Sequence, residues 1–390
     1  MKYLFLNEVI SEKITGDWGD EGEKVNVLRT TNFTNDGVID YSNVVTRDIP
    51  EKVIERKKLV QGDVIIEKSG GSPSQPVGRV VYFDRKDEVF LCNNFTAILR
   101  SNDLVFPKYL FYFLFSLHKL GITLKFQNKT TGIINLQLDK YLDRIQIPLP
   151  PFPEQKRIAE ILDKADALRL KNKQLLATYD ELLQATFLDM FGDPVTNSKG
   201  WEKKLIKEIG NVVTGNTPPR ATPENYGNYI EWIKTDNISS EIIYPTNSRE
   251  FLSEVGMKKG RVAPVGSILV TCIAGSLSSI GNCVITNREV AFNQQINAII
   301  PKKCNSYFLY SVMQYSKKVT QDAATKGMKK LLIKSNFEKL TIICPPIKLQ
   351  DQFAQIVENI EAQKTLVKQS LQESEYLFNG LVQKAFDGEL

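Results

Sequence analysis

The chain has a single histidine, His118, and five cysteines, none of them in a C-x-x-C pair. One imidazole cannot build a histidine-based catalytic triad or a histidine-rich metal cluster. The phosphate-binding motifs G-x-x-x-x-G-K-S/T and G-x-G-x-x-G are also missing. We therefore expect a protein that binds rather than catalyses, with no catalytic, metal-binding or cofactor-binding residues of its own.

Long apolar runs and a secretory leader are lacking too. The longest apolar stretch, Leu110–Phe115, is far shorter than the roughly 20 residues that a membrane helix needs. The odd number of scattered cysteines argues against a disulfide framework. These absences predict a protein of the reducing cytoplasm that has no membrane partner.

The composition is that of an ordinary globular chain with an uneven distribution of charge. With 390 residues, 42% of them hydrophobic, the chain is long enough for two or three domains. Residues 154–190 and 348–390 each contain more Asp and Glu than Lys and Arg, although the whole chain has a net charge of +5. The remaining parts are therefore basic, which favours contact with a polyanion there and with protein along the two acidic stretches.

The sequence repeats itself once. The run P-P-F-P-E-Q-K-R-I-A-E-I-L begins at Pro150, and P-P-I-K-L-Q-D-Q-F-A-Q-I-V begins at Pro345, half a chain later. Upstream of these runs, the segment at 28–33 matches that at 233–238, and the segment at 62–66 matches that at 266–270, with drifting spacing. A duplicated chain with one constant and one variable part in each half predicts a shared frame that presents two different binding domains.

Each repeat ends in a predicted long helix. Pro153 before Glu154 is typical of a helix start, and no Gly or Pro follows until Gly192. A heptad pattern predicts that the two helices pair as an antiparallel coiled coil of roughly 45–50 Å, with the globular domains at its opposite ends and a pseudo-two-fold axis between them. Asn172 is interpreted as a register residue. The predicted pairing residues are Ile158, Ile161, Leu168, Asn172, Leu175, Tyr179 and Leu182 in the first helix, and Phe353, Ile356, Ile360, Val367, Leu377 and Leu381 in the second.

Each globular part is predicted to be mixed α/β with short strands. The apolar runs at 62–68 and 266–271 each enter a loop of small residues, and 107–120 and 305–318 have helical spacing. Glycine loops at strand ends let backbone N–H groups approach phosphate, although the same glycines can simply satisfy turn geometry. The candidate contacts with a polyanion are Lys68, Ser69, Gly70, Gly71, Ser72, Gln75, Arg79, Lys125, Lys129, Thr130 and Thr131 in the first half, and Arg220, Lys234, Gly275, Ser276, Ser278, Thr325, Lys326, Lys329 and Lys330 in the second.

The runs P-L-P-P-F-P-E-Q-K-R-I-A-E-I-L-D-K-A-D at 148–166 and F-G-D-P-V-T-N-S-K-G-W at 191–201, together with the duplication, resemble the specificity subunits of type I restriction-modification enzymes. The resemblance covers the whole chain. The second copy departs from the first at Leu349 and Asp351, which replace Glu154 and Lys156, while Pro345, Pro346 and Gln350 keep the core of the motif.

The resemblance implies a non-catalytic subunit that recognises a bipartite site on double-stranded DNA and directs adenine methylation or cleavage by its partners. It implies two methyltransferase subunits that carry S-adenosylmethionine, and two restriction subunits that use ATP and Mg. It also implies two target recognition domains, at 1–150 and 193–345, followed by helical spacers at 151–192 and 346–390. A coiled-coil adaptor with two peptide- or protein-binding domains is the alternative.

Overall fold

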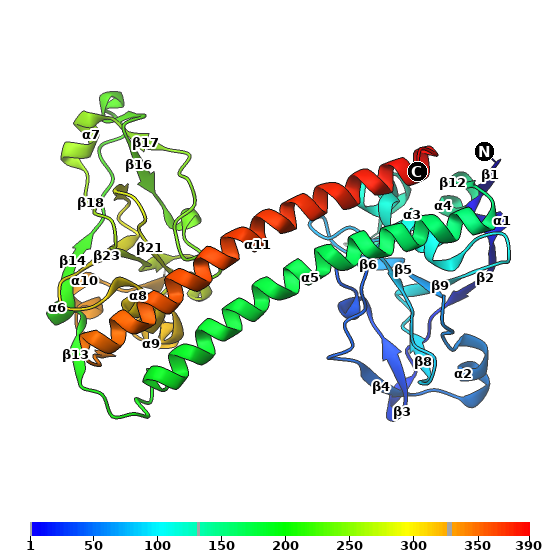
Figure 1. Ribbon diagram of the computed structural model, residues 1–390, viewed down its shortest axis with the longest axis horizontal. Helices are drawn as coiled ribbons and strands as arrows, with labels where there is room; N and C mark the ends of the chain where they lie inside the picture. The colour runs from blue at the N-terminus through cyan, green and yellow to red at the C-terminus, as the bar shows by residue number, and fades with distance from the viewer. Residues whose placement is uncertain (1, 131–132, 326–329) are drawn as a thin grey trace. The chain divides into compact units, whose positions relative to one another are not determined.

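The computed structural model describes residues 2–130, 133–325 and 330–390. The chain divides into two compact units, Met1–Lys173 with Gln369–Leu390 and Gln174–Lys368. Helix α5 (Phe152–Phe191) begins in the first unit and ends in the second, whereas α11 (Ile347–Asp387) begins in the second and ends in the first (Figure 1). Each unit thus combines one globular domain with one end of each long helix. None of the helices in the described ranges is long and apolar enough to cross a membrane.

A four-stranded antiparallel sheet forms the centre of the first unit. Its strands, in spatial order, are β2 (Ile10–Thr15), β9 (Thr96–Ser101), β5 (Val64–Glu67) and β7 (Val80–Tyr82). Successive side chains of a strand point to opposite faces, and in β5 this places Val64 and Ile66 in one core and Ile65 in another. All four residues of β5 are buried because both faces of the sheet are covered.

Smaller sheets and short helices complete the first domain. The strands are β4 (Val45–Asp48), β3 (Asp20–Leu28) and β8 (Phe90–Cys92) in one sheet, β10 (Gln127–Thr130), β11 (Ile133–Leu136) and β6 (Ser69–Gly71) in a second, and β1 (Lys2–Phe5) with β12 (Gln146–Leu149) in a third. The helices are α1 (Leu6–Val9), α2 (Glu51–Lys57), α3 (Pro107–Lys119) and α4 (Leu138–Arg144), with the 3-10 turns η1 (Thr30–Asn32) and η2 (Ile122–Phe126).

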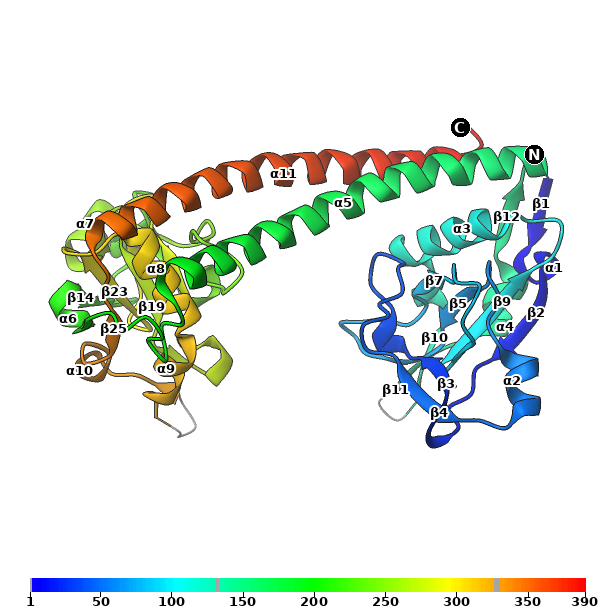
Figure 2. The ribbon, with the colours of Figure 1, turned by 60° about the horizontal axis from the view of Figure 1, so that its bottom comes forward.

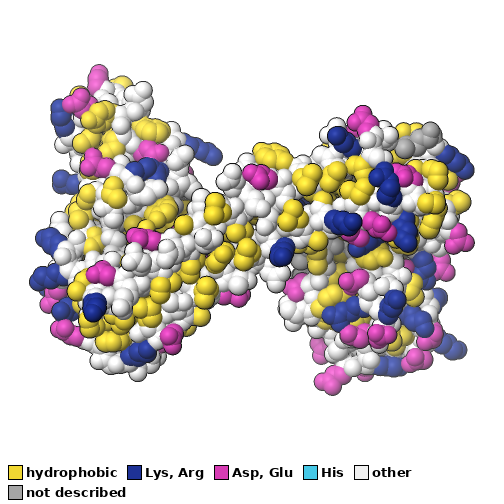
Figure 3. Space-filling view, viewed as in Figure 1, with side chains coloured by type: hydrophobic (Ala, Val, Ile, Leu, Met, Phe, Trp, Pro, Cys, Tyr) yellow, Lys and Arg dark blue, Asp and Glu magenta, His cyan; other side chains and the backbone are white. Residues whose placement is uncertain are grey.

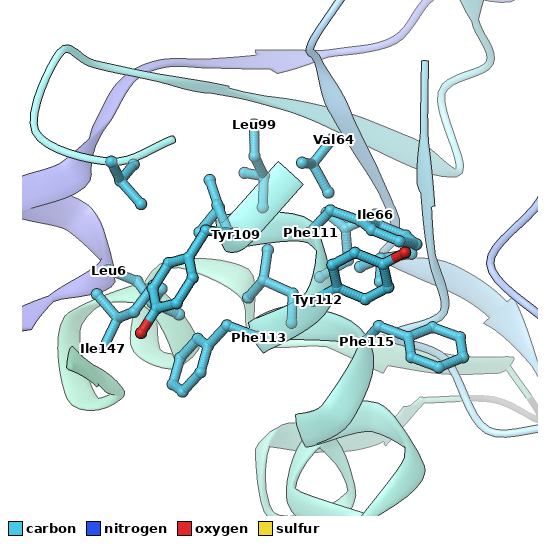
Figure 4. Packing of buried hydrophobic residues seen from close by; sticks show 14 of the residues in the cluster. Leu6, Val64, Ile66, Leu99, Tyr109, Phe111, Tyr112, Phe113, Phe115 and Ile147 are labelled. Atoms are coloured by element: carbon cyan, nitrogen blue, oxygen red, sulfur yellow. The ribbon is translucent and has the colours of Figure 1, made fainter. Parts of the chain in front are cut away.

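The predicted helix at 107–120 is α3, and it is the centre of the first core. Every residue from Tyr109 to Ser116 is buried, because one side of α3 packs on the four-stranded sheet and the other on the long helices (Figure 2). Figure 4 shows the rings of α3 beside Val64, Ile66 and Leu99 of the sheet. The ring centroids of Tyr109 and Phe113 lie 5.2 and 5.1 Å from that of Phe386 on α11. The C-terminal end of α11 is therefore part of the core of the first unit.

The second unit repeats this plan. Its central sheet has the order β14 (Gly210–Thr214), β23 (Ile296–Pro301), β19 (Ile268–Thr271) and β21 (Cys283–Ile285). The other strands are β15 (Tyr226–Gly227), β17 (Phe251–Leu252), β16 (Ile230–Ile233), β22 (Val290–Phe292) and β18 (Val262–Ala263), then β13 (Lys203–Leu205) with β25 (Thr341–Ile343), and β20 (Ile273–Ala274) with β24 (Lys330–Leu331). The helices are α6 (Ile206–Ile209), α7 (Glu254–Lys259), α8 (Ser306–Tyr315), α9 (Lys317–Asp322) and α10 (Lys334–Phe337), with the turns η3 (Pro223–Asn225), η4 (Thr235–Asn237) and η5 (Leu277–Ser279). The predicted mixed α/β duplication is confirmed.

A buried glutamine fixes the start of each long helix. Gln155 accepts a hydrogen bond from the Phe106 N–H (2.8 Å) and donates to the carbonyl of Leu104 (3.0 Å), in the segment that leads into α3. Gln350 accepts from the Asn305 N–H (3.0 Å), immediately before α8. The glutamine that both copies of the repeated motif share thus holds each long helix to the central helix of its own unit.

The two long helices run antiparallel. In the first unit, Lys173 of α5 forms an ion pair with Glu375 of α11. In the second unit, Asp180 of α5 forms an ion pair with Lys364 of α11. The partner number falls as the α5 number rises, which defines an antiparallel pair. Asn172 donates to the hydroxyl oxygens of Ser370 and Ser374 at 3.1 and 3.3 Å. The predicted antiparallel helix pair is confirmed.

The predicted phase of the seam needs correction at four leucines. Most predicted pairing residues are buried or half-buried, but Leu168, Leu175, Leu182 and Leu377 are 45%, 36%, 46% and 50% exposed. The inward stripe passes instead through the next residue of the chain, at Leu162, Arg169, Leu176, Leu183 and Phe378. The reason is that α5 packs on its own domain as well as on α11: Ile158 and Leu162 belong to the same core as α3.

An ion-pair network ties the first domain to α5. The Asp36 carboxylate accepts from Arg169 Nη1 (2.7 Å) and Lys173 Nζ (2.8 Å), and Arg169 also pairs with Asp166. Burial alone raises the pKa of the Asp36 carboxyl, but the hydrogen bond from Lys173 and the charge of Arg169 outweigh it and hold the pKa below its ordinary value of 3.8.

Replacing Asp36 with Asn should lower the free energy of unfolding of the first unit by about 1–3 kcal/mol at pH 7, because the buried Arg169 and the half-buried Lys173 lose a shared carboxylate. A carboxyl with a lowered folded-state pKa contributes stability above its unfolded pKa and loses it as the pH falls through the folded value. The difference in the free energy of unfolding between wild type and Asp36→Asn should therefore be largest at pH 7 and should shrink below about pH 4. Urea unfolding followed through Trp18 at several pH values measures this. Asp87→Asn, at an exposed position of the same unit, is the control, and a difference that persists undiminished at pH 3 would contradict the network.

Candidate nucleic-acid interface

The two loops predicted to contact DNA in the first half lie side by side. Strand β6, which contains Ser69–Gly71, pairs with β11, and β11 pairs with β10 in the order β10–β11–β6. Ser69 lies opposite Asn135, and its hydroxyl hydrogen bonds to the Asn135 side-chain oxygen. Strand pairing therefore joins the Lys68–Gln75 loop and the segment that begins at Lys125 into one surface.

The second half brings its predicted loops together in the same way. Strand β20 pairs with β24 so that Ala274 lies opposite Lys330. Gly275, Ser276 and Ser278 follow β20 as an exposed loop, and the two serine hydroxyls lie 2.6 Å apart. Thr325 is joined to this surface because its N–H donates to the Leu331 carbonyl (2.9 Å).

Several of the predicted contacts lie outside what the structure describes. Thr131, Lys326 and Lys329 are outside the described residues. For Lys129 and Thr130 the backbone is described but the side chains are not. These five positions stay predictions from the sequence.

Arg79 differs from the other candidates because its side chain is buried. Its Nε and Nη2 donate to the two carboxylate oxygens of Glu67 at 2.8 and 3.0 Å. Nη1 and Nη2 also donate to the carbonyls of Phe33 (2.7 Å) and Thr30 (3.1 Å). A guanidinium engaged by a carboxylate and two carbonyls is suited to holding the surrounding loops in place.

The predicted cations of the second half form one cluster. Arg220 and Lys234 both pair with Glu250, and both lie over the ring of Trp232, at 5.3 and 5.0 Å from its centroid. The hydrogen bond from Lys234 is the largest cause that lowers the pKa of the Glu250 carboxyl. One carboxylate balances only one of the two cations, so the cluster keeps a positive charge over an aromatic face.

The lysines of the first half differ in exposure. Lys125 is exposed at the end of η2, whereas Lys68 is half-buried with its Nζ 3.4 Å from the Thr15 hydroxyl oxygen. Burial lowers the pKa of the Lys68 ammonium group. An approaching phosphate would raise this pKa again, because an opposite charge favours the ammonium form, so Lys68 stays a candidate phosphate contact.

The structure also places Phe95, which sequence reasoning missed, beside the predicted loop. Its carbonyl accepts from the N–H groups of Lys68 (2.9 Å) and Ser69 (3.1 Å), and its exposed ring lies against Gly70, whose φ of +94° favours glycine. In the second unit the carbonyl of Gln295 makes the equivalent bonds. A single aromatic residue has no pattern in a sequence, so only the fold could assign it to this surface.

The single histidine lies near the C-terminal end of α3. Burial lowers the pKa of His118 to about 4, so the imidazole is neutral at pH 7. Its Nδ1 lies 3.4 Å from the Thr123 hydroxyl oxygen, which is consistent with a packing role.

Charges of both signs are interspersed over each unit on the face shown in Figure 3. Many of the cations are paired: among the candidates, Arg79, Arg220 and Lys234 each contact a carboxylate. The described parts of the paired loops combine hydroxyls, amides and backbone groups with the side chains of Lys68, Lys125 and Lys330. Such surfaces can contact phosphates through N–H groups and read base edges through side chains.

The fold and these surfaces define a duplicated binding protein, in which a shared pair of helices joins two domains with different loops. The family model for the type I restriction modification DNA specificity domain matches residues 19–178 and again 198–376. The chain belongs to this family.

Curated relatives and solved structures agree with the family. The chain is 22% identical over 352 residues to the putative type I restriction enzyme MjaX specificity subunit of Methanocaldococcus jannaschii, a match that covers 84% of this chain and 78% of the relative. It is 32% identical over 153 residues to the HindI specificity subunit of Haemophilus influenzae, which covers 38% of this chain and 32% of that relative. A type I restriction-modification S subunit from M. genitalium shares the fold, with a TM-score of 0.58, 13% identity and coverage of 99% and 96% of the two chains.

Proposed function

We propose that this chain is the specificity subunit of a type I restriction-modification complex and that each globular domain reads one half of a bipartite DNA target. The observation that carries the proposal is that both units, each matched by the specificity-domain family, bring the same two loops together at paired strands. Exposed polar groups at such edges suit contact with phosphates and base edges. Because DNA is the proposed ligand, we place the protein in the cytoplasm.

The proposed partners are two methyltransferase subunits that carry S-adenosylmethionine and two restriction subunits that use ATP and Mg. The part of α5 in the second unit offers them Leu175 and Leu182, exposed and seven residues apart on one face of the helix. Exposed leucines at heptad spacing are typical of a surface that a partner helix covers.

Replacing Leu175 and Leu182 with Asp should leave the chain folded, because both side chains are exposed, and should abolish co-purification with the methyltransferase subunits. Size-exclusion chromatography of the co-expressed subunits measures the complex, and circular dichroism checks the fold. The matched control is replacement of the exposed Leu366 and Thr365 of α11 with Asp. A double variant that still forms a complex of normal size would exclude these leucines from the contact.

DNA binding and the adaptor alternative predict different salt dependence. A DNA reader releases counterions on binding, so its affinity for random duplex DNA must fall steeply as salt rises. Fluorescence anisotropy at two salt concentrations measures this. The two family matches favour DNA over a peptide ligand. Sequencing of modified adenine in cells with and without the gene then identifies the target.

Replacing Lys68 with Ala should weaken binding about equally on specific and random DNA and lower the salt slope by about one unit, because a phosphate contact is independent of sequence. Anisotropy titrations over a range of salt concentrations give both numbers. Lys52→Ala, at an exposed position of α2, is the control. A loss confined to the specific site would contradict a phosphate contact at Lys68.

A further inference from the structure

A concave pocket of about 530 Å³ lies in the first unit between two segments that are far apart in the sequence. One wall is formed by residues between Thr30 and Asn35, and the other by residues between Gly70 and Gln75. Glu67 and Arg79 lie between the two walls. The pocket therefore adjoins the loop surface described above and adds to it the Thr30–Asn35 segment, which was not among the predicted contacts.

Arg79 holds both walls. Its guanidinium donates to the carbonyls of Thr30 and Phe33 in the first wall and to Glu67 at the end of β5. The side-chain oxygen of Gln75, in the amide orientation that satisfies both its groups, accepts from Arg79 Nη1 at 2.9 Å. Arg79 is 7% exposed and Glu67 is 3% exposed, so water competes little for these bonds. One buried side chain thus sets the distance between the two walls.

The pocket is polar but carries no net charge. Glu67 and Arg79 neutralise each other, and the other described residues that line the pocket have no ionisable side chain. Thr31 and Asn35 are exposed at its rim, and within the described ranges no protein hydrogen bond engages either side chain. A phosphate would bring its charge close to the Glu67 carboxylate without an uncompensated cation in the lining. The edge of a base is neutral and presents donors and acceptors, which hydroxyl and amide side chains match.

The second unit has different side chains at the equivalent positions. The Glu67 N–H donates to the Arg79 carbonyl (2.8 Å), and the Thr271 N–H donates to the Asn282 carbonyl (2.9 Å). Thr271 and Asn282 of the second unit therefore correspond to Glu67 and Arg79 of the first. Turn η4 aligns with η1 and places Asp236 where the first unit has Thr31. The same backbone framework therefore carries different hydrogen-bonding groups in the two domains, as two readers of different sequences require.

We propose that this pocket reads base edges in the half-site bound by the first domain, with Thr31 and Asn35 as the reading residues and Arg79 and Glu67 as positioning residues. The inference rests on the proposed function and deepens it, because it names residues that decide the sequence of one half-site. Lys68, by contrast, is proposed to contact the phosphate backbone. A variant at Lys68 should therefore weaken binding to specific and random DNA alike, whereas a variant in the pocket should weaken binding to the specific site only.

The test is the double variant Thr31→Ala and Asn35→Ala in the chain assembled with its methyltransferase subunits. Both side chains are exposed, so the fold is retained. Affinity for the specific duplex should fall about ten- to a hundredfold, while affinity for random duplex and the salt slope stay unchanged within about twofold. Sequencing of methylated adenine should show relaxed specificity in one half of the target. Asn359→Ala, at an exposed position of α11, is the matched control.

Arg79→Lys tests the positioning role separately, because an ammonium group cannot make the forked contacts. It should reduce the affinity for the specific site. Combining it with the Thr31 and Asn35 variants should add little further loss, because Arg79 acts only by positioning the wall that carries these two residues. Additive losses would overturn the positioning role.

Equal losses of the rim variants on specific and random DNA, with a lower salt slope, would show a phosphate contact and overturn base reading. Unchanged affinity and unchanged methylation would remove the pocket from the interface, while the proposed function would stand. If the wild-type complex binds no DNA in a salt-dependent manner, the proposed function fails as well, which is a distinct result.

Discussion

Replacing Phe353 with alanine should lower the free energy of unfolding of the second unit by about 3–5 kcal/mol. The Phe353 side chain is fully buried, and its ring lies 5.6 Å from that of Phe187 and 5.4 Å from that of Phe191, centroid to centroid. The substitution would leave a cavity where the start of α11 meets the end of α5. Edge-to-face contacts with two rings would be lost together with the buried area.

Urea unfolding followed by tryptophan fluorescence measures the Phe353→Ala effect, because Trp201 and Trp232 lie in the second unit. Leu366→Ala on the same helix is the control; its side chain is 60% exposed, so a change of at most about 0.5 kcal/mol is expected. A loss below about 1 kcal/mol for Phe353→Ala would mean that the aromatic cluster does not hold the helix ends together.

Exchanging residues 1–145 for those of a relative should change one half of the DNA target completely and leave the other half unchanged. The described loops of the first surface, Thr30–Asn35, Lys68–Gln75 and Lys125 onward, all lie within the exchanged segment. The helices and the second domain stay as they are. The donor must keep aromatic residues at the places of Tyr109, Tyr112 and Phe113, because these pack on Phe378 and Phe386 of the retained α11.

Sequencing of methylated adenine in cells that carry the hybrid identifies both half-sites. The reciprocal exchange of residues 193–340 is the matched control and should alter only the other half. A hybrid that remains stable and yet recognises two new half-sites would contradict independent reading by the two domains.

The duplication, the long helices and the mixed α/β class could be predicted from the sequence because each leaves a local pattern. The phase of the helix seam could not. A heptad count treats Ile161 and Leu162 as nearly equivalent, and the choice is made by the tertiary contacts of Leu162 with the core around α3. Arg169 and Lys364 also lie on the buried side, where a search for apolar residues passes over them.

The candidate interface was partly predictable. Small residues after a strand indicate a loop, which is confirmed at Gly275, whereas Gly70 lies in the short strand β6 because that segment pairs with β11. The sequence could not show that Arg79 is buried against Glu67, because that ion pair depends on a register between β5 and β7 that no local pattern encodes. The Thr30–Asn35 wall was visible only as a weak match between the two halves.

The composition of the first unit has a consequence for the order in which the protein can fold during synthesis. Its core includes Phe378 and Ala385, which leave the ribosome more than two hundred residues after the first domain's own strands. Until then the part of α3 that packs on α11 is exposed, and the nascent first domain is an incomplete folding unit with an apolar surface open to solvent. The second unit, Gln174–Lys368, is continuous in the chain and can be completed first. Folding of the N-terminal half should therefore wait for the last helix, and ribosome-bound chains that stop before residue 369 should be far more sensitive to protease in the first unit than in the second.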